Sequence, residues 1–119
     1  RLPVKIFIIN NMYMGMVRQW QELIHGGRYS ESYMEALPDF VKLAESFGAA
    51  GLRVSKPADV DDAINEMIAI DRAVIVDVKV DPHENCFPMI PSGAAHNEML
   101  LGPEDKAEVS TTEDGMVLV

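Results

Sequence analysis

Cysteine and basic residues are both scarce in this 119-residue sequence, and each shortage excludes a class of protein. With a single cysteine, Cys86, the chain cannot form an internal disulfide, so a disulfide-stabilised miniature fold is excluded. Only 10 lysines and arginines stand against 19 aspartates and glutamates, and no basic cluster forms the stripe that a phosphate backbone requires. We therefore expect no nucleic-acid partner, and we expect Cys86 to be a small buried apolar residue.

Long apolar runs are also missing. None reaches the length that spans a bilayer, and no signal-peptide pattern is present, so we expect no membrane association and a cytoplasmic protein. A plastid or mitochondrial location would apply only in a eukaryote, which nothing in the sequence indicates. The hydrophobic fraction of 48% suffices for one modest core. Because the sequence starts at Arg1, without an initiator methionine, and enters a strand pattern almost at once, we expect a piece of a longer polypeptide.

The spacing of apolar residues predicts strands that alternate with helices. Strands are expected over residues 4–9, 49–55 and 73–80, and helices from about Gly15 to the Gly26-Gly27 pair, over 37–48 and over 56–70. The first strand is a nearly continuous β-branched and aromatic run, which is typical of a strand buried on both faces. This order predicts a three-layer α/β/α fold with a mainly parallel sheet and right-handed crossovers.

The chain changes character after Asp81. Prolines become frequent and apolar periodicity is weak, so an extended segment is expected there. Its first half is apolar enough to pack on something, whereas the end is acidic. We therefore predict an α/β domain over residues 1–81, an extended arm over 82–101 and a flexible acidic tail over 102–119.

Two asparagines, Asn10 and Asn11, directly follow the first predicted strand. In parallel α/β sheets ligands bind beyond the carboxyl ends of the strands, so this is a ligand position. Asparagine is also common in ordinary turns, and the pair alone would favour that simpler interpretation. The three histidines lack the spacing of zinc ligands, so no zinc site is expected.

Several sequence blocks together are more specific than the asparagine pair. They are "NN" after a buried strand, "GMVRQWQEL" with "RYS", "PDFVKLAE", and "FPMIPSGAAHNEM". In this order they resemble the carboxyl-terminal part of the acetolactate synthase (acetohydroxyacid synthase) catalytic large subunit. The resemblance runs from about Val4 to Leu101.

The resemblance implies that residues 1–81 are part of a thiamine diphosphate-binding domain. Thiamine enzymes share a Gly-Asp-Gly motif followed by Asn-Asn, of which this sequence has only the second half. By resemblance, the side-chain oxygen of Asn11 and the backbone carbonyl of Tyr13 coordinate Mg²⁺, which prefers hard oxygen ligands. The implied cofactor-binding residues are Asn10, Asn11, Tyr13, Gly15 and Met16.

The resemblance also implies an active-site entrance, which in this family receives the second ketoacid and binds herbicides. Its residues would be Met16, Val17, Trp20, Ser92 and Gly93, with the arm over 82–101 covering the active site. Two alternatives stay open at this point. The apolar residues of the helix could be buried as core, and the arm could simply pack without a role in catalysis.

The implied reaction condenses pyruvate with a second 2-ketoacid, either pyruvate or 2-ketobutyrate, with decarboxylation, in branched-chain amino acid biosynthesis. No catalytic residue is expected in this chain, because the family's activating glutamate lies in an amino-terminal domain and its non-redox FAD in a central domain. We therefore expect the isolated chain to be inactive. The implied partners are those two domains, further copies in a homodimer or tetramer, and a small regulatory subunit. The alternatives are another thiamine diphosphate-dependent carboligase or decarboxylase, or a non-catalytic binding or oligomerisation module.

Overall fold

The computed structural model describes residues 2–105, which fall into two units. The first unit contains the chain up to Tyr13 together with Met34–His83, and the second contains Met14–Tyr33 together with the chain from Glu84. The division predicted at residues 81 and 101 stays a prediction, and most of the predicted acidic tail lies outside the described residues. Within residues 2–105, no helix combines the length and apolar character that a bilayer crossing requires.

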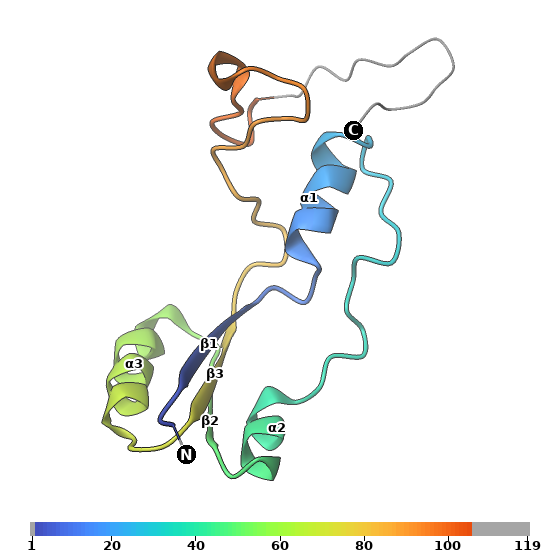
Figure 1. Ribbon diagram of the computed structural model, residues 1–119. Helices are drawn as coiled ribbons and strands as arrows, with labels where there is room; N and C mark the ends of the chain where they lie inside the picture. The colour runs from blue at the N-terminus through green and yellow to red at the C-terminus, as the bar shows by residue number, and fades with distance from the viewer. Residues whose placement is uncertain (1, 106–119) are drawn as a thin grey trace. The chain divides into compact units, whose positions relative to one another are not determined.

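The first unit is built on a parallel sheet of three strands (Figure 1). The strands are β1 (Lys5–Asn10), β2 (Ala50–Val54) and β3 (Val74–Lys79), so each predicted strand is confirmed with small shifts at its ends. Their order is β1-β3-β2, which puts the last strand of the chain in the middle of the sheet. All three therefore end at the same edge, the edge at which Asn10 lies.

Helices α2 (Phe40–Ser46) and α3 (Val60–Ala69) cover the two faces of this sheet (Figure 1). Side chains alternate along a strand, so every second residue of β2 and β3 faces α3 and forms the core. That core consists of Ala50, Val54, Val74, Val76 and Val78, with Leu52, Val60, Ala63, Met67 and Ile70 packed against it. The three-layer α/β/α arrangement predicted from the sequence is confirmed.

On the opposite face, α2 approaches β2 closely at Gly51. A Cβ atom on Gly51 would lie 2.7 Å from both the Cα and the carbonyl oxygen of Val41. The helix lies within the predicted range 37–48 and begins directly after Asp39, because the Asp39 side chain accepts hydrogen bonds from the backbone N–H groups of Val41 and Lys42. Gly48, with φ +73°, follows its end.

The expectation that the first strand is buried on both faces is wrong for the described chain. Ile6 is 45% exposed and Ile9 is 62% exposed. Within residues 2–105, β1 pairs with β3 alone and forms an edge of the sheet, while α2 and α3 pack mainly on β2 and β3. The apolar run therefore identified the strand correctly, but it did not predict how much of the strand other elements bury.

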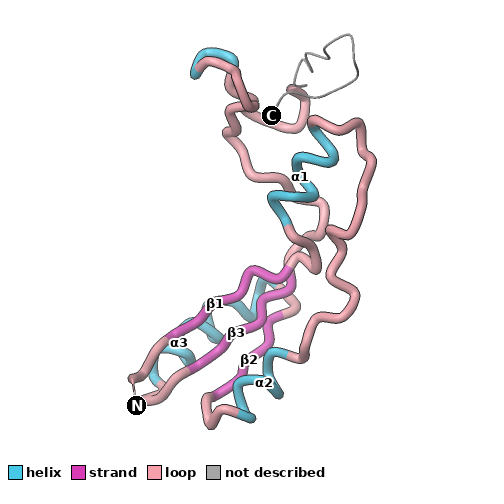
Figure 2. Tube along the Cα trace, turned by 45° about the vertical axis from the view of Figure 1, so that its right-hand side comes forward, coloured by secondary structure: helices cyan, strands magenta, loops and turns pink. Residues whose placement is uncertain are grey.

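The second unit contains helix α1 (Gly15–Leu23) and the extended arm (Figure 2). The arm bends back on itself through an antiparallel bridge between Met89 and Leu100, which exchange two backbone hydrogen bonds of 2.9 and 2.8 Å. Leu100 is buried, and a short 3₁₀ turn, His96–Glu98, lies between the two bridged residues. The arm is irregular, as the sequence predicts, but Leu100 is its only buried residue in the described part of the chain, and Ile90 and Leu101 are exposed. Its predicted packing over the active site stays a prediction.

The close approach at Gly51 leads to a stability prediction. Gly51→Ala should lower the free energy of unfolding by about 1–3 kcal/mol, because the backbone of Val41 must move to accommodate the added methyl group. The measurement is urea-induced unfolding of the protein, followed by circular dichroism.

The matched control is Gly102→Ala, where an added Cβ would have no atom within 4 Å. Its free energy of unfolding should change by less than about 0.5 kcal/mol. Equal unfolding curves for the two variants would contradict the close packing of α2 on β2.

Candidate functional site

The turn after β1 is stabilised by the side chains of both asparagines. Asn10 Oδ1 accepts a hydrogen bond from the backbone N–H of Met12 at 3.1 Å, and Asn11 Oδ1 accepts one from Tyr13 at 3.1 Å. Asn10 is 5% exposed, whereas Asn11 is half-buried. These hydrogen bonds agree with the interpretation that Asn10 and Asn11 form an ordinary turn. It does not compete with a ligand role, because an amide oxygen has two lone pairs and the Tyr13 N–H uses one.

Met12 has the left-handed backbone conformation in this turn, with φ +64°. For a residue that carries a Cβ this conformation is disfavoured by roughly 1–2 kcal/mol. Such residues persist where the surrounding hydrogen bonds impose the conformation, and they concentrate at ligand sites. The turn is thus a candidate site on conformational grounds as well as by its position at the carboxyl edge.

The oxygens of this turn fit part of a Mg²⁺ coordination shell. The Asn11 amide and the Tyr13 carbonyl are neutral, hard oxygen groups, which Mg²⁺ accepts in an octahedral shell. Among residues 2–105 there is no cluster of three or more His, Cys, Asp or Glu side chains that would bind a metal by itself. A metal ion bound at this turn would therefore need further ligands besides these two oxygens.

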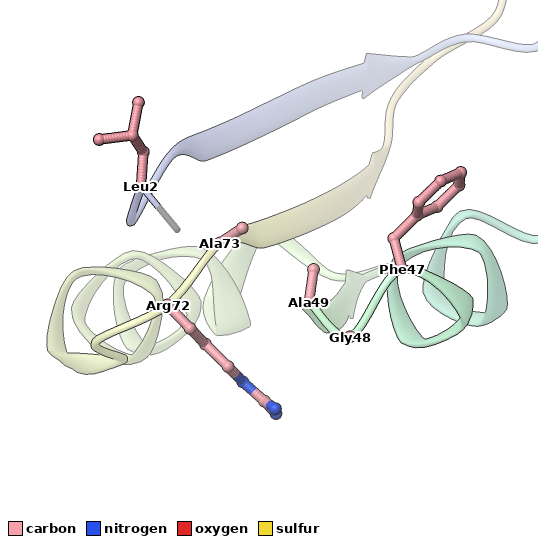
Figure 3. Close-up of a pocket in the computed structure, with 6 residues that line it drawn as sticks. All are labelled: Leu2, Phe47, Gly48, Ala49, Arg72 and Ala73. Atoms are coloured by element: carbon pink, nitrogen blue, oxygen red, sulfur yellow. The ribbon is translucent and has the colours of Figure 1, made fainter.

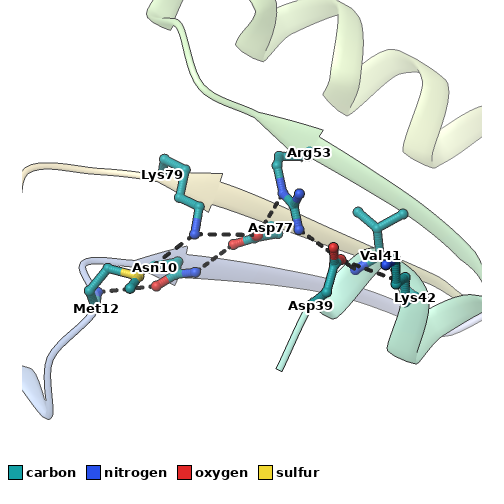
Figure 4. A network of polar contacts seen from close by, with 8 residues as sticks. All are labelled: Asn10, Met12, Asp39, Val41, Lys42, Arg53, Asp77 and Lys79. Atoms are coloured by element: carbon teal, nitrogen blue, oxygen red, sulfur yellow. Dashed lines mark hydrogen bonds and ion pairs between the residues drawn. The ribbon is translucent and has the colours of Figure 1, made fainter. Parts of the chain in front are cut away.

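A network of charged side chains lies beside Asn10 at the carboxyl edge of the sheet (Figure 4). Asp77 of β3 is 1% exposed, and its Oδ1 accepts a hydrogen bond from Asn10 Nδ2 at 2.7 Å. Its Oδ2 accepts one from Arg53 Nε at 3.0 Å and lies 3.7 Å from Lys79 Nζ. Arg53 also donates to Asp39, the residue at the start of α2, at 2.8 Å.

The hydrogen bonds of this network shift two pKa values. The bond to Asp77, followed by the bond to Asp39, raises the pKa of Arg53 above its ordinary value. The backbone N–H of Lys42 is the main cause that lowers the pKa of Asp39, and Arg53 lowers it further. Arg53 and Asp39 therefore both remain charged near neutral pH.

The predicted entrance residues of α1 are largely exposed in the second unit. Met16 is 55% exposed and Val17 is 43% exposed, whereas Trp20 is half-buried. Burial as core therefore does not describe Met16 and Val17. Gly15 is the first residue of α1, and the N-cap residue Met14 makes no side-chain capping bond in the described structure.

The buried face of α1 is polar and contacts the arm. Gln19 is 1% exposed; its Nε2 donates to the carbonyl of Cys86 at 2.9 Å, and its Oε1 accepts from the N–H of Cys86 at 2.7 Å. Its neighbour Arg18 forms an ion pair with Glu22 at 2.7 Å and donates to Asn85 Oδ1 at 3.3 Å. These contacts attach the start of the arm to the helix.

The expectation that Cys86 is buried is wrong, because this residue is exposed. Gln19 binds the peptide groups of Cys86, so packing of the thiol is not what fixes this position. Ser92 and Gly93, the predicted entrance residues of the arm, are also exposed, and Gly93 has φ +80°.

Asp77 and Gln19 are the polar residues that sequence reasoning missed. A signal existed for Asp77, because a carboxylate interrupts the apolar run of the clearest predicted strand, "AVIVDVKV". For Gln19 there was no comparable signal, since a glutamine on the polar side of a helix is normally solvated.

A shallow pocket lies at the other end of the sheet, before the starts of β2 and β3 (Figure 3). Its lining is Leu2, Phe47, Gly48, Ala49, Arg72 and Ala73. None of these residues was predicted as a site residue, and apart from the Arg72 guanidinium they offer apolar groups and backbone. The pocket is separate from the turn of Asn10 and Asn11.

Comparison with known proteins identifies the family. Residues 1–78 match the family model of the thiamine pyrophosphate enzyme, C-terminal TPP binding domain. The chain is 46% identical over 101 residues to the acetolactate synthase large subunit of Haemophilus influenzae, and these residues cover 84% of the chain and 18% of that relative. It is 43% identical over 108 residues to the acetolactate synthase isozyme 3 large subunit of Escherichia coli, covering 88% of the chain and 19% of that relative.

A third relative agrees with these two in name and in the extent of the match. The acetolactate synthase large subunit of Cyanidium caldarium is 44% identical over 100 residues, covering 83% of the chain and 17% of that relative. The chain thus spans less than a fifth of the length of these curated relatives. Because the family model matches well over half of the chain, the chain belongs to the thiamine pyrophosphate enzymes, as a C-terminal TPP-binding domain.

Proposed function

We propose that the chain is the carboxyl-terminal part of an acetolactate synthase large subunit. This enzyme would condense pyruvate with a second 2-ketoacid, pyruvate or 2-ketobutyrate, with decarboxylation, in branched-chain amino acid biosynthesis. The names of the relatives support the assignment. The observation that carries it in the structure is the strained turn at Asn10–Tyr13, which presents amide oxygens at the ligand-binding edge of a parallel sheet.

In this proposal the turn binds the metal of the cofactor. Asn11 Oδ1 and the Tyr13 carbonyl would be two ligands of Mg²⁺, and the ion would bind the diphosphate of thiamine diphosphate. Gly15 and Met16, in the first turn of α1, would contact the cofactor together with Asn10. Thiamine diphosphate supplies the carbanion chemistry when bound, so the residues of this chain orient the cofactor and limit the access of water.

The second unit would supply part of the substrate entrance. Met16, Val17 and Trp20 present apolar surface on α1, and Ser92 and Gly93 lie on the arm. The two hydrogen bonds between Gln19 and Cys86 attach the arm to the helix that carries these residues. A buried amide with both of its groups paired resists displacement, because separation would leave two polar groups unsatisfied.

The remaining parts of the enzyme would come from outside this chain. They include the carboxylate of the Gly-Asp-Gly motif, the activating glutamate and the FAD-binding domain. The partners in this proposal are the amino-terminal and central domains, further copies in a homodimer or tetramer, and a small regulatory subunit, in the cytoplasm. Another thiamine diphosphate-dependent enzyme remains the alternative, since the family model covers thiamine enzymes in general.

Removal of the proposed metal ligand should weaken Mg²⁺ binding. In the natural full-length polypeptide, Asn11→Ala should raise the Kd of Mg²⁺ at saturating thiamine diphosphate at least tenfold, because an oxygen ligand is lost. Calorimetric titration with Mg²⁺ measures this, and 2-acetolactate formed from pyruvate reports the activity.

Asn65→Ala, at an exposed position of α3, is the matched control and should leave the Mg²⁺ affinity unchanged. An unchanged affinity in Asn11→Ala as well would refute the metal assignment. A full-length protein that uses pyruvate but releases a product other than 2-acetolactate would instead favour another thiamine enzyme.

The isolated 119-residue chain should form no 2-acetolactate from pyruvate, even with thiamine diphosphate and Mg²⁺ in excess. It contributes two of the metal ligands at most and no activating glutamate. A Mg²⁺-dependent product signal from the purified chain that Asn11→Ala abolishes would show that this expectation is wrong.

Loss of the Gln19 amide should loosen the arm. Gln19→Leu removes both hydrogen bonds to Cys86, which together contribute about 1–3 kcal/mol, so amide hydrogen exchange over residues 84–91 should accelerate roughly tenfold or more. Hydrogen exchange of the full-length protein with detection by mass spectrometry measures this.

The matched control is Gln21→Leu on the same helix. The Gln21 amide donates to the carbonyl of Ser30 and not to the arm, so exchange over residues 84–91 should stay close to that of the unchanged protein. Equal exchange in the two variants would mean that Gln19 does not anchor the arm.

A further inference from the structure

A buried carboxylate, Asp77, lies at the centre of the sheet next to the turn that carries the proposed metal ligands. The proposed function gives it no part. Removal of a carboxylate from water is costly unless charged partners and hydrogen bonds compensate for it. A 1% exposed aspartate in the middle strand of a valine-rich sheet therefore requires a structural or functional reason.

The two oxygens of Asp77 have different partners (Figure 4). Oδ2 faces both cations, with Arg53 Nε at 3.0 Å and Lys79 Nζ at 3.7 Å. Oδ1 accepts the 2.7 Å hydrogen bond from Asn10 Nδ2. The charge is thus compensated on one side of the carboxylate, and the other side binds the neutral amide of Asn10.

This contact fixes which way the Asn10 amide points. An ionised carboxylate can only accept hydrogen bonds, so the NH₂ group of Asn10 must face it. The amide oxygen then faces the other way and accepts the 3.1 Å bond from the N–H of Met12. A rotated amide would place oxygen against oxygen and NH₂ against N–H, with both bonds lost.

The Met12 N–H belongs to the strained part of the turn. Met12 has φ +64°, which a residue with a Cβ adopts only under constraint, and Asn10 Oδ1 supplies such a constraint. The next residues are bound in the same way, since Asn11 Oδ1 accepts from Tyr13. The series of contacts therefore runs from Asp77 through Asn10 to the residues that would bind Mg²⁺.

We propose that Asp77 is a positioning residue for the metal turn: its carboxylate orients the Asn10 amide, and Asn10 in turn imposes the backbone conformation that presents Asn11 and Tyr13. The inference rests on the proposed function for the identity of the ion. The hydrogen bonds that connect Asp77 to the turn through Asn10 do not depend on any ion.

The first test is Asp77→Asn in the natural full-length polypeptide. Arg53 is a donor, so the single oxygen of the new amide would face Arg53, and its NH₂ group would face the NH₂ group of Asn10 and turn that amide around. The Kd of Mg²⁺ at saturating thiamine diphosphate should rise about 10- to 100-fold, the usual range for loss of a group that orients a metal ligand.

The matched control is Asp39→Asn. It removes a carboxylate from the same Arg53 network, and asparagine is an equally good residue at the start of a helix. Its Mg²⁺ affinity should stay within about twofold of the unchanged protein. Equal Mg²⁺ affinities in the Asp77 and Asp39 variants would overturn the inference.

A second readout avoids the metal. In the metal-free full-length protein, amide exchange at Met12 should be faster in Asp77→Asn than in Asp39→Asn, as followed by nuclear magnetic resonance. Unchanged protection of Met12 would overturn the inference whether or not the protein binds Mg²⁺. By contrast, a full-length protein that binds neither Mg²⁺ nor thiamine diphosphate would overturn the proposed function alone.

A double variant separates positioning from a general loss of stability. Asn10→Ala breaks the same contact from the other side, and Asn10→Ala with Asp77→Asn should bind Mg²⁺ no more weakly than Asn10→Ala alone. If the losses of Mg²⁺ affinity in the two single variants multiply in the double variant, the two residues act independently and the inference is overturned. If Asp77→Asn does not fold, amide exchange at Met12 in metal-free Asn10→Ala decides: faster exchange than in the unchanged protein supports the inference, and unchanged exchange overturns it.

Discussion

Hydrogen bonding of β3 to both β1 and β2 is the constraint on which the first unit depends. The parallel register pairs Asn10 with Lys79 on one side of β3 and Val54 with Val78 on the other. Strand ends are therefore level at one edge, and the side chains of three separate segments come within hydrogen-bonding distance there. The buried contact between Asn10 and Asp77 exists because of this register, since a shift of one residue would turn Asp77 to the face that α3 covers.

Each unit contains a buried polar side chain that fixes an irregular segment. Asp77 binds the amide of Asn10 in the first unit, and Gln19 binds both peptide groups of Cys86 in the second. A buried polar group is expensive unless its partners are placed correctly, so it disfavours other conformations of the segment that it binds. In this way loops acquire a defined conformation from the regular elements beside them.

The limits of prediction from sequence follow from the range of the interactions. Alternation and helical periodicity are local, and they predicted the three strands and the helix over 37–48 that contains α2. The ligand role of Asn10 and Asn11, inferred from their place after β1, stays a prediction. The partners of Asn10 and Gln19 lie 67 residues away, and no local pattern reports such pairs. For the same reason the burial of β1 and of Cys86 was predicted wrongly. The apolar character of a residue indicates that it favours burial, whereas its actual burial depends on which other segments pack against it.

The place of β3 in the sheet has a consequence for the order in which the chain folds during synthesis. Among residues 2–105 it is the last strand to be synthesised, yet β1 and β2 both pair with it. The sheet of the described residues therefore cannot form until the chain has been synthesised through β3, and the pairing of β1 with β3 closes a loop in which Asn10 and Asp77 are 67 positions apart. Until then β1 lacks the strand with which it pairs, and an unpaired strand with apolar side chains makes an incompletely folded chain prone to aggregation.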